Sequence, residues 1–334
     1  MTYEPPFKIT HEILSLVEKI GEQIGSFNAM DKLSSVPKLR RANRIKTIQG
    51  SLAIEGNTLD LQQVTAVVNG KKVLGQPREI QEVLNAFTVY EKLTQYSPYS
   101  IDNMLNAHEI LMSSLVEESG TFRSKGVGIM RGNDLIHVAP PTDKISFLIN
   151  DLLEWLKNTD IHPLVASSVF HYEFEFIHPF QDGNGRMGRL WQTLLLMKWQ
   201  PIFEYLPVEQ VVRERQKDYY AALSCSDNSS DSTYFIEFML QAILQAILEV
   251  DTEQVTEQVT EQVKRLLSVM DDISYSGKEL MVKLGIVHRP TFFYSYLRPA
   301  LDAGIIEMTV PDKPRSSLQR YRLTSKGLHV KSDD

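Results

Sequence analysis

The chain has 334 residues, of which 43% are hydrophobic and 23% charged, as in a globular protein rather than a disordered or fibrous one. This length predicts two or three folding units. The net charge of -7 argues against a protein whose whole surface binds nucleic acid. It does not exclude a local basic patch. The single cysteine, Cys225, excludes an intramolecular disulfide.

The beginning of the chain lacks the basic-then-apolar order of a signal peptide, because Glu4, Pro5, Pro6 and Lys8 come first. We also expect no apolar run of about 18 residues, and so no membrane segment. Together with the lone cysteine, this predicts a cytoplasmic protein.

The first predicted helix lies in the segment 45–57 and is ended by Gly56. Ile45, Ile48 and Leu52 share one face, and Gly56 is a typical C-terminal glycine. Glu55 is its last residue and lies on the same face. Because a carboxylate is disfavoured at the negative end of a helix, by roughly 0.3 to 1 kcal/mol, a nearby cation would explain it.

Further helices are predicted by apolar residues at helical spacing. They cover 100–116, which begins with a serine cap, and then 143–157, 163–177, 186–199 and 234–250. Between the first two, the range 127–141 has two short extended runs around Arg131, Gly132, Asn133 and Asp134. This pattern predicts a β-hairpin.

The unit Thr-Glu-Gln-Val occurs three times from Thr252 to Val263. Its four-residue step keeps the valines close on a helix, so the segment is predicted to be a linker helix. The range 264–334 then predicts three helices followed by two strands, with Arg320 to Thr324 as the second strand. It has 12 Lys and Arg against 8 Asp and Glu, a net charge of +4, which leaves -11 for the rest.

The chemically informative segment is the loop from His178 to Arg189, between two predicted helices. Gly183 and Gly185 allow positive φ angles and close approach, so successive N–H groups can converge on an anion at the next helix N-terminus. Arg186 and Arg189 lie three residues apart, and both guanidinium groups are expected to reach the same polyphosphate.

His178 and Asp182 would supply the reactive groups of this loop. An imidazole with an ordinary pKa of roughly 6.5 is a natural general base at neutral pH. A single carboxylate suits Mg²⁺, which fills its remaining positions with phosphate oxygens and water. Phe180 is expected to anchor the loop on the core.

The run His178-Pro179-Phe180-Gln181-Asp182-Gly183-Asn184-Gly185-Arg186-Met187-Gly188-Arg189 resembles the Fic family motif, His-x-Phe-x-(Asp/Glu)-Gly-Asn-Gly-Arg-x-x-Arg, at all eight fixed positions. The resemblance implies a mainly α fold: an N-terminal helical region at 1–95, then a helical catalytic core at 100–240 with a β-hairpin flap. It also implies a protein adenylyltransferase, which moves AMP from ATP, with Mg²⁺, to a Ser, Thr or Tyr hydroxyl of a protein target.

The resemblance further implies residue roles. His178 would be the catalytic base, Asp182 would hold Mg²⁺, and Arg189 would contact the terminal phosphate. The flap would align an extended target segment, and the paired tyrosines would pack on the nucleotide base. Many members carry an asparagine where this chain has Asp227, which leaves the base preference open. The expected nucleotide-binding residues are Val127, Gly128, Ile129, Met130, Asp182, Gly183, Asn184, Gly185, Arg186, Met187, Gly188, Arg189, Tyr219, Tyr220 and Asp227.

The segment from Ser51 to Asn57 resembles the inhibitory motif of Fic proteins, Ser/Thr-x-x-x-Glu-Gly/Asn, here in a helix expected at about 44–57. It implies that Glu55, with Ser51 as the first motif residue, inhibits the enzyme. Glu55 would pair with Arg189 and occupy the space that the terminal phosphate needs.

Two alternative functions stay open. The same site could remove AMP from a target, with Glu55 orienting a water molecule. The range 264–334, after a linker helix at 241–263, resembles a winged helix on the runs 296–299, 304–306 and 321–324. The chain could then be a DNA-binding regulator with a nucleotide-sensing core.

In that reading, the phosphate contacts would be Arg289, Arg298, Arg315 and Arg320. However, Phe292, Phe293 and Tyr294 on the expected recognition helix favour packing against another surface. A homodimer is also consistent with the family, whose members often form dimers.

Overall fold

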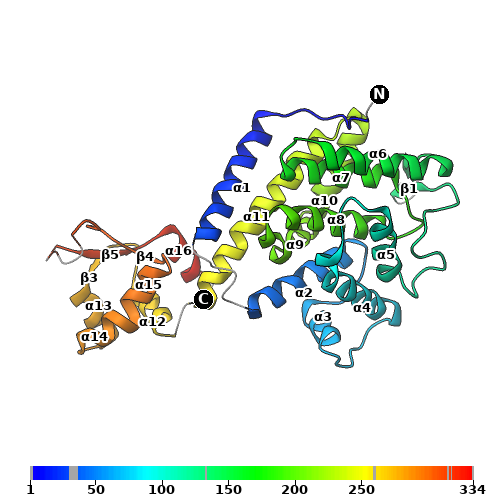
Figure 1. Ribbon diagram of the computed structural model, residues 1–334. Coiled ribbons are helices and arrows are strands. Elements are labelled where there is room, and N and C mark those ends of the chain that lie inside the picture. Colours follow the sequence, from blue (N-terminus) through cyan, green and yellow to red (C-terminus); the bar gives the residue numbers. More distant parts are fainter. Residues whose placement is uncertain are drawn as a thin grey trace. The chain divides into compact units, whose positions relative to one another are not determined.

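The computed structural model describes residues 3–29, 37–131, 134–258, 261–313, 316 and 318–332 (Figure 1). They form two compact units, Met1–Ile247 and Leu248–Asp334. Helices dominate both units, which confirms the predicted mainly α class. Each unit has an apolar core of its own.

The first unit consists of helices and one hairpin. Its α-helices are α1 (His11–Ala29), α2 (Pro37–Ile54), α3 (Leu61–Val68), α4 (Pro77–Glu91), α5 (Ile101–Leu111), α6 (Ile145–Asn158), α7 (Pro163–Ile177), α8 (Asn184–Trp199), α9 (Val208–Glu214), α10 (Gln216–Ser229) and the first part of α11 (Thr233–Gln258). Its 3-10 helices are η1 (Leu93–Gln95), η2 (Thr142–Lys144) and η3 (Pro201–Tyr205). Every helix predicted in this unit is present, although α5 ends before 116 and α2 begins well before 44.

Helices α7 and α8 form the centre of the first unit (Figure 1). Phe170, Phe174 and Trp191 are fully buried between them and their neighbours. Pro163 occupies the first position of α7, where its missing N–H removes no helical hydrogen bond. The chain returns from the C-terminus of α7 to the N-terminus of α8 through residues 178–183, and this places the predicted reactive loop at one end of the helix pair.

Helix α2 ends at Ile54, so Glu55 lies in the turn after the helix rather than in its last turn as expected. Gly56 adopts φ +93°, the left-handed conformation that ends many helices. Gly50 permits close packing on α9, since a Cβ there would lie 2.7 Å from backbone atoms of Glu209 and Gln210. The glycine therefore determines how deeply α2 sits in the unit.

The predicted hairpin is confirmed by β1 (Gly128–Arg131) and β2 (Asp134–Val138), which pair antiparallel. Gly128 lies opposite Val138, and the register shifts between Ile129 and Met130. The predicted turn residues Gly132 and Asn133 lie outside the described residues.

Helix α11 bears most closely on the expectation of no long apolar run, although Glu237, Gln241, Gln245 and Glu249 interrupt its apolar residues. Its window Thr233–Val250 is long and apolar enough to cross a membrane, with a mean hydropathy of 1.3. However, 56% of this window is buried inside the structure, and Phe235, Ile236 and Leu240 have no exposed surface. The core helix of a globular protein can be equally long and apolar, so length and hydropathy are weak grounds for a membrane span.

The second unit combines short helices with a small antiparallel sheet of strand order β3-β5-β4. Its elements after α11 are α12 (Glu261–Val269), β3 (Tyr275–Ser276), α13 (Gly277–Leu284), α14 (Arg289–Thr291), the π-helix η4 (Phe292–Leu297), α15 (Arg298–Asp302), β4 (Ile306–Met308), β5 (Arg320–Leu323) and α16 (Ser325–Ser332). The predicted second strand is confirmed as β5, whereas β3 and α16 were not predicted. Val263, the last valine of the repeats, is buried in this core.

The basic residues expected to contact DNA are partly engaged within the second unit. Arg298 lies 3.6 Å from Asp302, and Arg320 donates to Glu279 at 2.9 Å. Arg315 lies outside the described residues. Phe293 and Tyr294 are 41% and 64% exposed. DNA binding by this unit therefore stays a prediction.

Candidate active site

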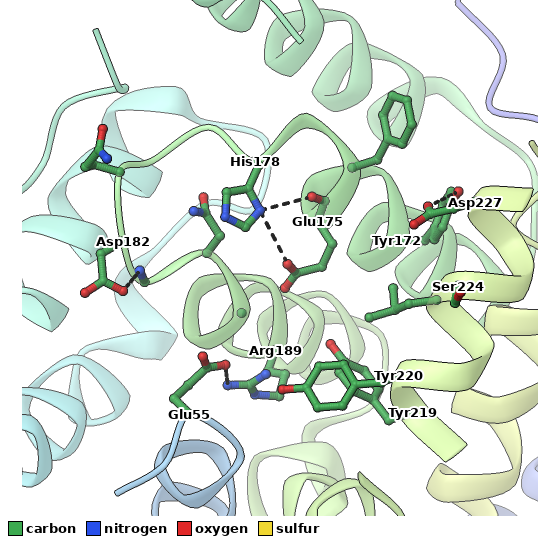
Figure 2. A pocket seen from close by; sticks show the side chains of 16 residues that line it. Glu55, Tyr172, Glu175, His178, Asp182, Arg189, Tyr219, Tyr220, Ser224 and Asp227 are labelled. Atoms are coloured by element: carbon green, nitrogen blue, oxygen red, sulfur yellow. Dashed lines mark hydrogen bonds and ion pairs between the residues drawn. The ribbon is translucent and has the colours of Figure 1, made fainter. Parts of the chain in front are cut away.

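The predicted reactive loop lines a cavity of about 490 Å³ in the first unit (Figure 2). The walls come from the ends of α2 and α7, the loop itself, the first turn of α8, and α10. The lining residues are Glu55, Tyr172, Glu175, Phe176, His178, Gln181, Asp182, Gly183, Asn184, Gly185, Arg189, Tyr219, Tyr220, Leu223, Ser224 and Asp227.

The loop is held by hydrogen bonds and by one buried ring. Asn184 accepts from the N–H of Phe180 and donates to its carbonyl oxygen, both at 2.8 Å. Phe180 is fully buried, as predicted, and stacks on the His108 ring with centroids 3.7 Å apart. His108 Nδ1 accepts from the N–H of Gly120, so Nε2 is left to donate to the Asp182 carbonyl oxygen at 3.0 Å. Burial lowers the pKa of His108 to about 4.

Arg123 is a buried cation whose side chain, among the described residues, donates to carbonyl oxygens. Its Nε donates to the His178 carbonyl at 2.7 Å, and its Nη2 to that of Pro140 at 2.6 Å. Its Nη1 donates to the carbonyl of Lys125 at 3.1 Å. Lys125 and Pro140 flank the hairpin, so one guanidinium ties both ends of the flap to the loop. His178 itself adopts φ 51°, an uncommon conformation for a non-glycine residue.

The helix N-terminus at the cavity suits an anion. Gly183 is the N-cap of α8 with φ +89°, and the backbone N–H groups of the first turn have no helical acceptors. Gly185 lies inside the helix without a positive φ, so its expected backbone freedom is not used. It is needed for close approach instead, since a Cβ would fall on the Glu55 carboxylate and 3.0 Å from Arg189 Nη1.

Asp182 projects into the cavity with its side chain 41% exposed. Its Oδ1 accepts from Arg186 Nη2 at 2.9 Å, and Arg78 lies 3.4 Å from Oδ2. Among the described residues, no group of three or more His, Cys, Asp or Glu side chains could hold a metal ion without other ligands. A single exposed carboxylate beside an anion site fits Mg²⁺, which shares its ligands with phosphate.

The two arginines of the motif point to different partners. Arg186 is buried, lies outside the cavity lining, and donates to Glu82 at 3.2 Å as well as to Asp182. In this arrangement it orients Asp182, and joint binding of one polyphosphate by both guanidinium groups stays a prediction. Of the two motif arginines, Arg189 lines the cavity and Arg186 does not.

Arg189 is held by α2 and the turn after it. Its Nη2 donates to Glu55 Oε1 at 2.7 Å and to the Ser51 carbonyl at 3.0 Å, while its Nε donates to Ser51 Oγ at 3.1 Å. Burial by itself lowers the pKa of Arg189, but Glu55, Tyr219 and Glu175 together outweigh burial and the net shift is upward. Arg189 therefore stays charged, and Glu55 occupies its cavity side (Figure 2).

The far wall of the cavity is aromatic. Tyr219 is buried and Tyr220 half-buried, with centroids 5.3 Å apart. The Tyr172 hydroxyl donates to Asp227 Oδ1 at 2.9 Å. An aromatic wall that ends in a carboxylate can take a flat, polar ring such as a nucleobase.

Six lining residues were not predicted: Tyr172, Glu175, Phe176, Gln181, Leu223 and Ser224. A signal for most of them exists in the sequence. Positions 172, 175 and 176 recur at helical spacing before His178, and 223 and 224 recur between Tyr220 and Asp227.

Besides Arg186, three further predicted nucleotide-binding residues do not line the cavity. Met187 is fully buried in the core, and Val127 lies before the hairpin. Gly188 faces α7, where a Cβ would lie 2.9 Å from the His171 ring. The side chains of Ile129 and Met130 lie outside the described ones, as does any side-chain contact of the flap.

Comparison with known proteins agrees with this geometry. The Fic/DOC family matches residues 98–196, and the domain described as "Filamentation induced by cAMP protein Fic-like, C-terminal domain" matches residues 261–324. Protein adenylyltransferase fic-1 of Caenorhabditis elegans is 28% identical over 237 residues, which are 67% of this chain and 44% of that protein. Protein adenylyltransferase Fic of Nematostella vectensis is 31% identical over 242 residues, or 67% of this chain and 52% of that protein. The chain thus spans about half the length of the curated relatives it matches.

Solved structures extend the likeness over nearly the whole chain. The crystal structure of a Fic family protein from Desulfovibrio desulfuricans G20 is 55% identical and has a TM-score of 0.74. The match covers 97% of this chain and 99% of that one. A C. elegans Fic-1 structure shares the fold at 23% identity, with a TM-score of 0.61. The chain therefore belongs to the Fic family.

Proposed function

We propose that the cavity binds ATP and transfers AMP to a Ser, Thr or Tyr hydroxyl of a protein target. The observation that carries the proposal is the convergence of His178, Asp182 and the α8 N-terminus on one cavity. An imidazole beside an anion-binding helix end is what phosphoryl transfer to a hydroxyl requires. The names of the relatives, protein adenylyltransferases, support AMP as the transferred group.

His178 removes the proton from the incoming hydroxyl group of the target. The oxygen of that hydroxyl attacks the α-phosphorus at the same time. The new P–O bond forms as the bond to the leaving pyrophosphate breaks. Backbone N–H groups of the first turn of α8 bind the phosphate oxygens, and Arg189 binds the terminal phosphate once Glu55 has left it. Positioning and charge neutralisation supply most of the rate enhancement in such transfers.

Asp182 would hold Mg²⁺, which neutralises phosphate charge when it is bound. Arg186 and Arg78 already hold the two oxygens of this carboxylate, so they orient it toward the cavity. Tyr219 and Tyr220 pack against the base, and Asp227 accepts from a base amino group. The flap at Val127–Pro141 presents its strand edge to the target segment.

Glu55 keeps the enzyme inhibited. Its carboxylate neutralises Arg189 and stands beside Gly185, at the position where a terminal phosphate would meet the helix end. Removal of AMP by the same site is the alternative outcome, because Glu55 lines the cavity and could orient a water molecule there.

The test uses Glu55→Gly protein with ATP labelled at either the α- or the γ-phosphate, and cell extract as the source of targets. AMP transfer retains only the α label on protein, and His178→Ala in the same background abolishes labelling. Retention of the γ label would instead mean phosphate transfer. Release of AMP from pre-modified protein, without any labelling, would support the removal reaction.

A further inference from the structure

Glu175 touches the expected catalytic base through both its backbone and its side chain. His178 Nδ1 lies 3.2 Å from the Glu175 carbonyl oxygen and 3.9 Å from Glu175 Oε2 (Figure 2). The two residues are three apart, at the C-terminus of α7, and both line the cavity.

The carbonyl contact determines the tautomer of His178. In a continuous helix the Glu175 carbonyl would accept from the N–H four residues later, but that residue is Pro179, which has none. The carbonyl is thus open to a side-chain donor. Since a carbonyl oxygen only accepts, Nδ1 must carry the proton in this contact. Nε2 of the neutral ring is then the nitrogen with the lone pair.

The side chain of Glu175 is largely buried and closely packed. It is 14% exposed, and among the described residues no hydrogen-bond partner reaches its Oε1. A Cβ on Gly188 would lie 3.2 Å from the same oxygen, so α8 holds the carboxylate close to the loop. Such a buried carboxyl group is costly to ionise without a cation nearby.

We propose that Glu175 is a positioning residue for the transfer reaction, which orients His178 and stabilises the imidazolium formed when Nε2 takes the target proton. The proton moves from the target hydroxyl to Nε2, Nδ1–H stays directed at Glu175, and the carboxylate faces the new positive charge. In this arrangement an acidic residue orients the general base, as a third group does in many catalytic sites. The kinetic part of the inference rests on the proposed function, but the orientation of His178 does not.

Several charged or titratable groups face Glu175 besides His178. They are His171 on α7, Glu55 after α2, Arg189 on α8, and Tyr219 and Tyr220 on α10. Burial and then the Glu55 carboxylate raise the pKa of Glu175 to about 8, while Arg189 opposes the rise. Removal of Glu55 therefore lowers the pKa of Glu175 and favours its carboxylate form. Glu55 thus weakens the support of His178 as well as blocking Arg189.

The primary test is the imidazole pKa and tautomer of His178, measured by NMR titration of ring-labelled protein with His178→Ala as the assignment reference. In the Glu55→Gly background, Glu175→Gln should lower the His178 pKa by about one unit, because an opposite charge near an imidazole raises it. With Glu55 present the same substitution should shift it less. The acid limb of the transfer rate should move to lower pH by the same amount, with kcat about tenfold lower and ATP affinity unchanged.

Glu173→Gln is the matched control. Glu173 is a buried carboxyl on the same helix, but it accepts from the Tyr3 hydroxyl and does not line the cavity. This variant should leave the His178 pKa at its parent value. If Glu175→Gln does not fold, Glu175→Asp keeps the charge and should hold the pKa closer to the parent.

The inference is overturned if Glu175→Gln leaves the His178 pKa unchanged in the Glu55→Gly background, or if the neutral ring carries its proton on Nε2. Both readouts are independent of catalysis. Absence of any nucleotide transfer would therefore count against the proposed function without deciding the role of Glu175.

Discussion

Arg189 and Glu55 form an ion pair of 2.7 Å between residues 134 positions apart in the sequence. The Arg189 side chain is 2% exposed and that of Glu55 34%, so this pair lies in the cavity wall and is largely shielded from solvent. Loss of one partner from a buried pair leaves the other charge uncompensated. A terminal phosphate is the anion that would replace Glu55 beside Arg189.

Ser51→Ala should raise AMP transfer several-fold, but less than removal of Glu55. It deletes the acceptor of Arg189 Nε, whereas the carbonyl of residue 51 and Glu55 still hold Nη2. Initial rates with labelled ATP measure the effect. Ser97→Ala, at an exposed serine outside the site, is the control and should match the parent. A rate equal to that control would mean that Ser51 adds nothing to the inhibition.

Gly50→Ala should destabilise the protein and partly activate it at once. The new Cβ would meet fixed backbone of α9 at 2.7 Å, so α2 must move, and α2 carries Ser51 and leads to Glu55. We expect a loss of about 1–3 kcal/mol in the free energy of unfolding, as for other overpacked sites. Urea melts and transfer rates test both effects. Gly21→Ala, where a Cβ meets nothing within 4 Å, is the control.

Arg123→Met should lower AMP transfer at least about 100-fold in the Glu55→Gly background. Without the guanidinium, the carbonyls of His178, Lys125 and Pro140 lose their donor, so the loop and the flap come apart. Arg123→Lys keeps the charge but cannot reach all three carbonyls, and it should recover only part of the rate. Steady-state kinetics should show the loss mainly in kcat. Arg298→Met, at an exposed arginine of the second unit, should behave like the parent.

Acid should destabilise the fold through two buried histidines. Burial lowers the pKa of His171 to about 3 and that of His108 to about 4. In the unfolded chain both have the ordinary imidazole pKa of 6.5, so the unfolded state binds more protons below that pH. Their stabilisation is complete above pH 6.5 and is lost as the pH falls toward 4.

At pH 5 each of these histidines should have lost about 2 kcal/mol of stability. Urea melts at pH 7, 6 and 5 measure the total, and His171→Gln should flatten the dependence. His11→Gln, at an exposed position, should keep it. A free energy of unfolding that does not fall between pH 7 and pH 5 would refute the assignment.

Much of the site could be predicted because the reactive residues are contiguous. The eight motif positions lie within twelve residues, and their order alone indicates a helix-capping anion site. The pairing of Glu55 with Arg189 followed only from the resemblance to Fic proteins, since no local pattern links positions so far apart.

The remainder depends on backbone groups that carry no sequence signature. Arg123 and His108 bind carbonyl oxygens of the loop, and Glu175 meets His178 partly through its own carbonyl. Likewise, the spacing of Arg186 and Arg189 predicts that Arg186 binds phosphate. In the fold, however, the Arg186 guanidinium donates to Glu82 on α4 and to Asp182. A residue spacing fixes which side chains can reach a point, whereas the neighbours decide which of them do.

The most direct measurement is the rate of protein-bound AMP formation by the parent protein, Glu55→Gly and Glu55→Gly/His178→Ala at saturating ATP and Mg²⁺. The account predicts at least about a tenfold higher rate for Glu55→Gly than for the parent, equivalent to about 1.4 kcal/mol, and no transfer by the double variant. Equal rates for the parent and Glu55→Gly, or undiminished transfer without His178, would contradict it.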